Sequence, residues 1–453
     1  MAKLKTLSFI LSFFFLLSSC TEIKIAGIDI EELRRTAGAT GDSSSDSRGD
    51  FESIFDATIP FTSGGPAAAT HNYTCGITKT KNVLCWGANH LGQLGDGTYN
   101  DSLDPVTVLG GEQGGDELEN IIAIAAGHSH TCAVESNGAV YCWGTNNTTN
   151  GVLGIGSTVL TDSTTPVRVL KGEQNSSSDY LEGAKDIGAG FHHTCIHTVS
   201  NTIYCWGTGN VGRLGDGGNT VRSTPVQVVG GEQGGPFFEN TRQISVGFRE
   251  VCAVSEDDEL YCWGDRNSSG SSVAGTVVSP RRTESGEQGG HAYLENVKMV
   301  ATNWNETCAL IHDGSVYCWG QTSTNNMGHD QNAGLVHTLP MKVLAGEQTT
   351  GSVGGYLGDI KFITAGIRNR CAITNQNEAL CWGQVFSAHP TYVLAGDQGS
   401  GRFKNILSIK YSALNICAFD TNHKPYCWLY NGQGQLGLGI ADGGYMQPKF
   451  LEL

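Results

Sequence analysis

The chain has 453 residues, a formal net charge of −16, only 16% charged residues, 62 glycines and 15 cysteines. A protein this acidic repels phosphate backbones, and no run of lysine or arginine is longer than two, which argues against a nucleic-acid partner. Abundant glycine with few charges suits many short strands joined by turns.

The first twenty residues have the organisation of an export signal. Two lysines precede an apolar run from Leu7 to Leu17, which is too short to span a membrane as a mature helix. The run ends in Leu-Ser-Ser-Cys, which closely resembles the lipobox of bacterial lipoproteins. The sequence therefore predicts a lipoprotein signal peptide over residues 1–19 and lipidation of Cys20. The alternative is an ordinary signal that is cleaved nearby, with Cys20 incidental.

Residues 20–64 are predicted to be a lipidated N-terminus and a flexible tether. The stretch from Gly38 to Asp50 is rich in Ser and Asp, a composition that does not build a core. Thr21 stands where the inner-membrane retention signal of such lipoproteins usually has aspartate. We therefore expect a lipid-anchored protein of the bacterial cell envelope, in the outer membrane.

From about residue 65 the chain is a repeat array. A cysteine, nine further residues and a Cys-Trp pair recur seven times, and the two apolar arms around a polar turn predict a β-hairpin. The spacing within each hairpin never changes, whereas the distance between hairpins varies, so loops absorb the variation. The pairs are Cys75 with Cys85, Cys132 with Cys142, Cys195 with Cys205, Cys252 with Cys262, Cys308 with Cys318, Cys371 with Cys381 and Cys417 with Cys427.

Each repeat adds two further strands to its hairpin. An apolar run ending in Gly precedes the hairpin, as in Ile121 to Gly127, and a run opened by proline follows it, as in Pro166 to Leu170. Proline at the start of the last run suits an edge strand, where its missing N–H costs no ladder bond. Four strands in each of seven units predict an all-β fold, a seven-bladed β-propeller over residues 65–453.

The repeats resemble a known family. The stretch from Gly127 to Asn146, together with Leu-Gly-Gln-Leu-Gly-Asp-Gly at 91–97 and a similar stretch at 211–217, is similar to the regulator of chromosome condensation repeat. The resemblance implies a seven-bladed propeller, and it is a better guide to the fold than to the function. Family members include a nucleotide-exchange factor for a small GTPase and a secreted β-lactamase-inhibitory protein. The export signal and the regular cysteines argue against an intracellular exchange role.

The fourteen hairpin cysteines are predicted to form seven disulfides, one per blade. Opposed positions of an antiparallel hairpin bring their side chains close, and an exported chain meets an oxidising compartment. Zinc is the competing interpretation, but it needs ligand pairs brought together in fours, whereas this spacing keeps the pairs apart.

Two other groups of residues leave alternatives open. Histidines cluster before the hairpins of blades one to three, and they could form a metal site or be structural residues of the repeat. They are His71, His128, His130, His192 and His193. A Gly-Glu-Gln or Gly-Asp-Gln turn recurs between blades, with its acids either binding cations or satisfying the turn's own backbone. These acids are Glu112, Glu173, Glu232, Glu287, Glu347 and Asp397.

We interpret the function as non-catalytic, since no nucleophile elbow, phosphate-cradling loop or zinc-protease helix is present in the sequence. The predicted role is a membrane-tethered binding module for a protein or glycan partner outside the cytoplasm, acting as a monomer without cofactor or metal. The alternative is an extracytoplasmic hydrolase or lyase acting on envelope glycans.

The candidate partner-binding residues lie where the repeat pattern breaks, in blades four to six. Because successive strands alternate in direction, the turn between strands one and two lies on the same face as the loop between strands three and four. Trp and Arg are enriched at binding hot spots, and we expect those of the first turns to be exposed. The candidates are Phe248, Arg249, Trp304, Arg368 and Arg370.

Overall fold

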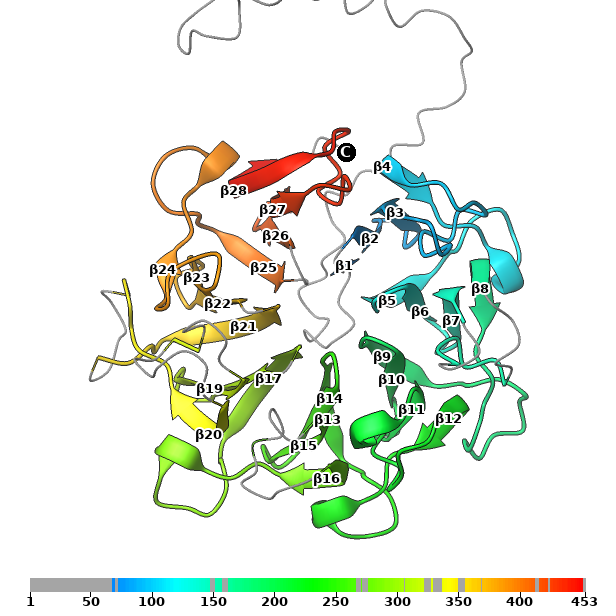
Figure 1. Ribbon diagram of the computed structural model, residues 1–453, viewed down its shortest axis with the longest axis horizontal. Helices are drawn as coiled ribbons and strands as arrows, with labels where there is room; N and C mark the ends of the chain where they lie inside the picture. The colour runs from blue at the N-terminus through cyan, green and yellow to red at the C-terminus, as the bar shows by residue number, and fades with distance from the viewer. Residues whose placement is uncertain are drawn as a thin grey trace, which may run out of the picture. The chain divides into compact units, whose positions relative to one another are not determined.

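Seven four-stranded antiparallel sheets are arranged in a ring as the blades of a propeller (Figure 1). The computed structural model describes residues 67–69, 72–146, 151–156, 162–265, 270, 276–304, 306–321, 327–328, 336–348, 355–367, 369–411, 415–422 and 424–450. This architecture confirms the predicted fold class. The predicted signal peptide, the tether and Cys20 lie outside the described residues. No helix in the described ranges is long and apolar enough to cross a membrane.

Strand order in each blade follows the sequence, from the central axis to the periphery (Figure 1). The innermost strands are β1 (Ala67–Ala69), β5 (Ile121–Ala126), β9 (Ala184–Ala189), β13 (Thr241–Val246), β17 (Val297–Asn303), β21 (Ile360–Gly366) and β25 (Ile406–Tyr411). The second strands are β2 (Tyr73–Ile77), β6 (His130–Glu135), β10 (His193–Thr198), β14 (Glu250–Ser255), β18 (Glu306–Ile311), β22 (Asn369–Thr374) and β26 (Asn415–Asp420).

The outer half of each blade completes the sheet. The third strands are β3 (Val83–Gly87), β7 (Val140–Thr145), β11 (Ile203–Gly207), β15 (Leu260–Gly264), β19 (Val316–Gln321), β23 (Ala379–Gly383) and β27 (Pro425–Asn431). The outermost strands are β4 (Ser102–Thr107), β8 (Asp162–Arg168), β12 (Arg222–Gln227), β16 (Val277–Arg282), β20 (Val336–Lys342), β24 (Thr391–Tyr392) and β28 (Asp442–Phe450). Short 3-10 helices are η1 (Gly111–Gln113), η2 (Asn210–Gly212), η3 (Gly231–Gln233), η4 (Gly286–Gln288) and η5 (Gly396–Gln398).

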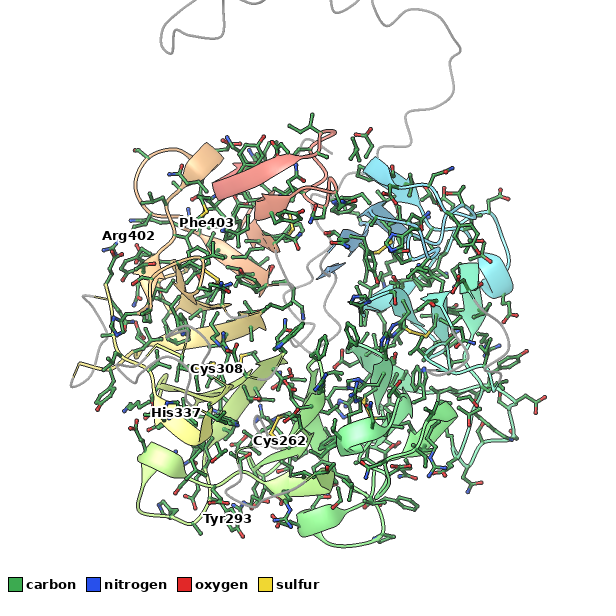
Figure 2. The ribbon with its side chains drawn as sticks, in the orientation of Figure 1. Cys262, Tyr293, Cys308, His337, Arg402 and Phe403 are labelled. Atoms are coloured by element: carbon green, nitrogen blue, oxygen red, sulfur yellow. A yellow bond between two sulfur atoms is a disulfide. The ribbon has the colours of Figure 1, made fainter. Side chains whose placement is uncertain are left out.

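The second and third strands carry the disulfides, and the predicted pairing is confirmed. In the register of every hairpin the two cysteines face each other directly, and each pair is bonded with a Cα–Cα distance of 4.0–4.2 Å (Figure 2). These strands are buried on both sides by neighbouring blades, which explains their continuously apolar sequences. The bonds join Cys75 to Cys85, Cys132 to Cys142, Cys195 to Cys205, Cys252 to Cys262, Cys308 to Cys318, Cys371 to Cys381 and Cys417 to Cys427.

Six of the seven outermost strands begin before their proline, and therefore earlier than the sequence predicts, whereas β24 begins just after Pro390. β8 starts at Asp162, so Pro166 lies inside the strand and does not open it. The predicted edge position is nevertheless correct, because β8 pairs only with β7 and its outer side has no strand partner. Proline is tolerated there because its missing N–H belongs to the unpaired side of the strand.

At six of the seven seams, a glycine of the loop between strands three and four lies against the tryptophan of the next blade. The indole Nε1 of Trp143 donates to the carbonyl of Gln93 at 2.9 Å, and Trp206 donates to Val152 in the same way at 2.8 Å. Gly95 lies against the Trp143 ring, where a Cβ would stand 2.7 Å from Nε1, and its φ of +72° favours glycine. The Leu-Gly-Gln-Leu-Gly motif is therefore an interblade contact.

The Gly-Glu-Gln turns form a second kind of interblade contact, which we call the edge clamp. The clamp consists of one blade's Gly-Glu-Gln (or Gly-Asp-Gln) turn seated on the outermost strand of the next blade. In each of six clamps the acid accepts the backbone N–H two residues after that strand's proline. The pairs are Glu112 with Arg168, Glu173 with Gln227, Glu232 with Arg282, Glu287 with Lys342, Glu347 with Tyr392 and Asp397 with Phe450, at 2.7–3.1 Å.

The clamps bear on both interpretations of these turns. The glutamine bonds its own loop, as Gln113 does by donating to Glu119 O and accepting from Glu119 N. The acid bonds the next blade and not its own turn, so this part of the expectation is wrong. Each carboxylate is held by a structural contact, which supports an architectural role over a ring of cation sites.

Candidate functional site

Side chains at the start of the second strands meet between blades, and we call these positions the turn ring. At the interfaces of blades one and two, two and three, five and six, and seven and one, the residue two before the first hairpin cysteine contacts the residue one before the corresponding cysteine in the next blade. His130 Nε2 lies 2.9 Å from Thr194 Oγ1, and Asn415 donates to Thr74 Oγ1 at 3.3 Å across the seam between the last blade and the first. His130 and Thr194 are both fully buried.

Arg370 belongs to this ring, and its predicted place on the surface is wrong. Its guanidinium is 1% exposed and donates to the carboxylate of Glu306 in the preceding blade, which is 2% exposed. In the repeat, Arg370 of blade six stands at the position that Thr194 occupies in blade three. An ion pair therefore replaces a neutral hydrogen bond at this interface, and Arg370 is not available to a partner.

Burial keeps the turn-ring histidines neutral. Burial, followed by the neighbouring His192 and His128, lowers the pKa of His130 to about 3. Burial and Arg213 likewise lower the pKa of His193 well below its usual range. No group of three or more His, Cys, Asp or Glu side chains within the described ranges is arranged to hold a metal. His71 lies outside them.

We expect this burial to make stability fall in mild acid. The unfolded chain binds a proton on His130 near pH 6.5, whereas the folded chain binds it only near pH 3, so stability is lost as the pH falls through this window. The expected contribution of His130 is about 1.4 kcal/mol per pH unit between pH 6 and 4. Guanidinium unfolding at a series of pH values measures it.

His130→Asn is the matched control, because Asn415 performs the same contact in the last blade. Between pH 6 and 4, this variant should take up one proton fewer on unfolding than the parent protein does. An unchanged pH slope would show that His130 does not titrate on unfolding.

Four rings form a continuous row of contacts next to the turn ring, and we call them the aromatic arc. They are His128, Phe191, Phe248 and Trp304, one from the first turn of each of blades two to five. Successive ring centroids are 4.3, 4.1 and 4.1 Å apart. The first pair meets edge to face at 61°, and the last two pairs are inclined by 34° and 35°. The predicted residues Phe248 and Trp304 are therefore brought together, and both are partly exposed.

Trp304 adopts a backbone conformation that bulky residues rarely take. Its φ is +47°, in the left-handed region, and its N–H donates to the side chain of Asn303 at 2.7 Å. Such a conformation is costly for a large side chain and persists only where its surroundings enforce it. The turn therefore holds the indole against Phe248 at the end of the arc.

Positive charge accompanies the arc on this otherwise acidic chain. Arg249 is exposed, and its guanidinium lies 5.6 Å from the centroid of the Phe248 ring. Arg213 is buried near Arg249. Burial, followed by repulsion from Arg249, lowers the pKa of Arg213 to about 10. Burial, His128 and Arg213 lower the pKa of His192 to about 4, so the histidine is neutral at pH 7. Arg368 lies outside the described residues.

The sequence interpretation missed two members of the arc. The sequence pattern indicates a metal ligand or a structural residue at His128 and does not single out Phe191. All four rings stand four residues before the first cysteine of their hairpins, so alignment of the repeats on this cysteine would have found them.

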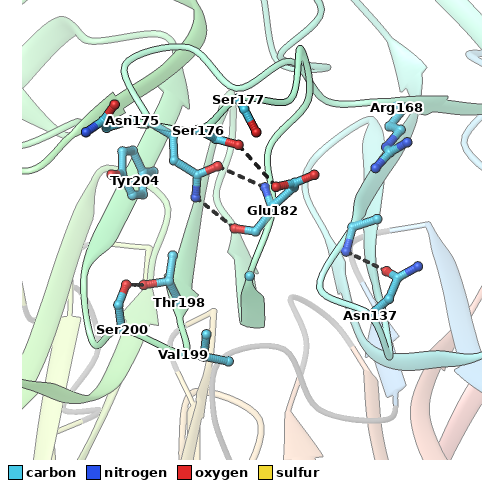
Figure 3. A pocket seen from close by; sticks show the side chains of 13 residues that line it. Asn137, Arg168, Asn175, Ser176, Ser177, Glu182, Thr198, Val199, Ser200 and Tyr204 are labelled. Carbon is cyan, nitrogen blue, oxygen red and sulfur yellow. Dashed lines mark hydrogen bonds between the residues drawn. The ribbon is translucent and has the colours of Figure 1, made fainter.

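The opposite face carries a polar pocket between blades two and three (Figure 3). Its volume is about 810 Å³, and its polar groups largely bond one another. Ser176 donates to Glu182 at 3.1 Å, and the hydroxyls of Thr198 and Ser200 lie 2.9 Å apart. A smaller pocket of about 340 Å³ occupies the equivalent place one blade later, so the pocket is a feature of the repeat.

Family models match two parts of the array. A model of the regulator of chromosome condensation (RCC1) repeat matches residues 82–134, and a second model of this repeat matches residues 121–151 and 242–271. Ultraviolet-B receptor UVR8 of Arabidopsis thaliana is 28% identical over 326 residues, which cover 69% of this chain and 64% of the receptor. E3 ubiquitin-protein ligase HERC2 of Homo sapiens is 28% identical over 63% of this chain.

This chain spans less than two thirds of those relatives, and only 5% of HERC2. Among solved structures, Prp20p of Saccharomyces cerevisiae matches with a TM-score of 0.64 and 20% identity, over 82% of this chain and 86% of that one. Human WBSCR16 matches with a TM-score of 0.64 and 17% identity, over 82% and 94%. At these identities the structural matches show the fold.

Proposed function

We propose that this seven-bladed propeller, which matches models of the regulator of chromosome condensation repeat at residues 82–151 and 242–271, is a non-catalytic protein-binding module. The aromatic arc is the binding surface, and the observation that carries the proposal is the unbroken row of four contacting rings across four blades with the exposed Arg249 beside it. Partly exposed aromatic and arginine side chains are the usual anchors of protein interfaces.

The ring geometry favours a protein over a glycan as the partner. Phe248 lies between Phe191 and Trp304 at 4.1 Å from each, so neighbouring rings cover both of its faces. Its edge remains for a ligand, which suits an apolar side chain better than a sugar ring lying flat. Arg249 adds a site for a carboxylate of the partner. Proteins are also the partners named with yeast Prp20p, Gsp1p and histones with one of its structures and Kap60 with another.

The proposed place of action is the outer side of the cytoplasmic membrane, with Cys20 as the lipid anchor. Support comes from the lipobox-like end of the leader and from the seven hairpin disulfides, since disulfides persist in oxidising compartments. The outer membrane is the proposed address, on the grounds of Thr21.

Replacement of Cys20 tests the anchor. Cys20→Ala should abolish labelling by a radioactive fatty acid and move the chain from the membrane fraction to the soluble fraction, because no lipid can be attached. Cys20→Ser serves as a second variant with the same expectation. A chain that remains in the membrane fraction after either change is anchored by something else.

Truncation of the arc tests the binding surface. Trp304→Ala together with Arg249→Ala should weaken binding of a protein captured from an envelope extract by more than about 1 kcal/mol, the loss expected of hot-spot anchors. Binding is measured by calorimetry with the captured protein. Phe237→Ala, which removes an aromatic ring 39% exposed on the opposite face, should leave binding unchanged.

Treatment of the extract separates the classes of partner. Protease digestion should abolish capture and glycosidase digestion should not. Capture that survives protease and depends on a polysaccharide would contradict the proposal and favour a glycan ligand. Release of shortened glycans by the purified chain would favour the hydrolase or lyase.

A further inference from the structure

One outermost strand stands apart from the other six. Edge clamps cover β8, β12, β16, β20, β24 and β28, each from the preceding blade. In the part of the chain that the structure describes, no acid accepts the N–H of Thr107 in β4, the position equivalent to Arg168 and Gln227. The prolines of the six clamped strands are buried, whereas Pro105 of β4 is partly exposed.

β4 presents the same backbone groups as the clamped strands. Val106 pairs with Cys85 of β3, as Val167 pairs with Cys142 and Val226 with Cys205. The neighbouring carbonyl of Pro105 and N–H of Thr107 therefore point away from the blade, because alternate residues of a strand direct these groups to opposite sides. The open edge of β4 therefore offers a hydrogen-bond acceptor, Pro105 O, and a donor, the Thr107 N–H, two residues apart.

The six clamps define what such an edge binds. Carboxylates of Glu173 and Glu347 accept the N–H two residues after the proline, while their own backbone N–H groups donate to the carbonyls of Pro225 and Pro390 at 2.9 and 2.8 Å.

The residue before the acid is glycine in all six clamps. In the first clamp Gly111 has a φ of +54°, and a Cβ there would stand 2.2 Å from Pro166 O. A turn that binds such a strand edge therefore needs a glycine followed by an acidic residue.

Apolar side chains extend the surface beside β4. Leu103 is 38% exposed and packs against the loop of the last blade, where a Cβ on Gly434 would lie 2.4 Å from Leu103 Cδ2. Ile440, which is 48% exposed, follows Gly439 in the same loop, and Gly439 lies beside Asp104. Exposed apolar side chains next to an unpaired strand edge are typical of a docking surface.

From these observations we infer that the β4 edge is a docking site for a partner protein carrying a Gly-Glu-Gln or Gly-Asp-Gln turn, which completes the ring of edge clamps in trans. The partner's acid accepts the Thr107 N–H, its backbone N–H donates to Pro105 O, and its glycine passes over the proline. A second copy of this chain does not fit, because its six such turns are engaged in its own clamps. The site is independent of the aromatic arc.

A peptide copied from the chain's own third clamp tests the inference. The probe is residues 228–239 joined end to end, since Phe238 N and Val228 O are bonded at 2.9 Å in the protein and the ends already lie together. Binding of the labelled peptide to the full chain is followed by fluorescence anisotropy up to 1 mM, and we expect saturation. The peptide with Glu232→Gln should bind at least tenfold more weakly.

Variants of the receiving strand locate the site. Thr107→Pro removes the outward N–H without removing a bond of the β3–β4 ladder and should weaken binding at least tenfold, whereas Thr107→Ala keeps this N–H and should change binding less than twofold. Thermal unfolding confirms that both variants fold. Hydrogen exchange gives a second readout, because the Thr107 amide should exchange faster than those of Gln227 and Arg282 until the peptide is added.

Several results would overturn the inference. One is the absence of saturable binding up to 1 mM, and another is equal binding of the Glu232→Gln peptide. Binding that is indifferent to Thr107→Pro would place the peptide elsewhere. Slow exchange of the Thr107 amide without peptide would show that the chain itself already covers the edge.

Discussion

Arg370→Ala is expected to lower the free energy of unfolding by about 3–5 kcal/mol, because it leaves a buried carboxylate without its partner. Glu306 is 2% exposed, and Arg370 supplies its cation from the next blade. The two residues are distant in sequence, so the loss should weaken the interface between blades five and six. Equilibrium unfolding in guanidinium, with the disulfides intact, measures the change.

A double substitution separates the ion pair from the space it fills. Glu306→Asn with Arg370→Thr reproduces the contact between Asn415 and Thr74 that the protein uses between its last and first blades. This variant should recover most of the stability lost in Arg370→Ala, since no unpaired charge remains buried. A double variant less stable than the single one would show that the charges themselves stabilise this interface.

Removal of one hairpin disulfide is expected to cost about 3 kcal/mol, by the entropy of closing a loop of about ten residues in the unfolded chain. Cys252→Ser with Cys262→Ser is the clearest case, because both sulfurs are buried and the bond joins adjacent strands of one blade. Hairpin structure that persists in the unfolded chain would reduce the value. Calorimetric unfolding of the variant against the parent gives the difference.

Peptide mapping without reduction is the control for that experiment. Every linked pair should join cysteines ten residues apart in the sequence, as the seven disulfides do. A dominant link between blades would contradict the hairpin register, and the stability difference would then report on another loop.

Much of the fold follows from local sequence. The spacing of Cys132 and Cys142 places them opposite each other in a two-stranded hairpin, and no distant contact is needed to predict this. The recurrence of the hairpin sets the number of blades, and the alternation of strand direction places Phe248 and Trp304 on one face. These predictions succeeded because each depends on residues close together along the chain.

The sequence by itself thus determined the propeller, its seven disulfides and the face on which the candidate site lies. Only the tertiary structure decided which side chains of that face are available. Arg249 and Arg370 both lie beside a first turn, but Arg370 is already in the strand, where it meets Glu306 of another blade and is buried. The packing of blades also turned the acids of the Gly-Glu-Gln loops into clamps and joined four rings into an arc. Such contacts link residues that are far apart along the chain, and no local pattern specifies them.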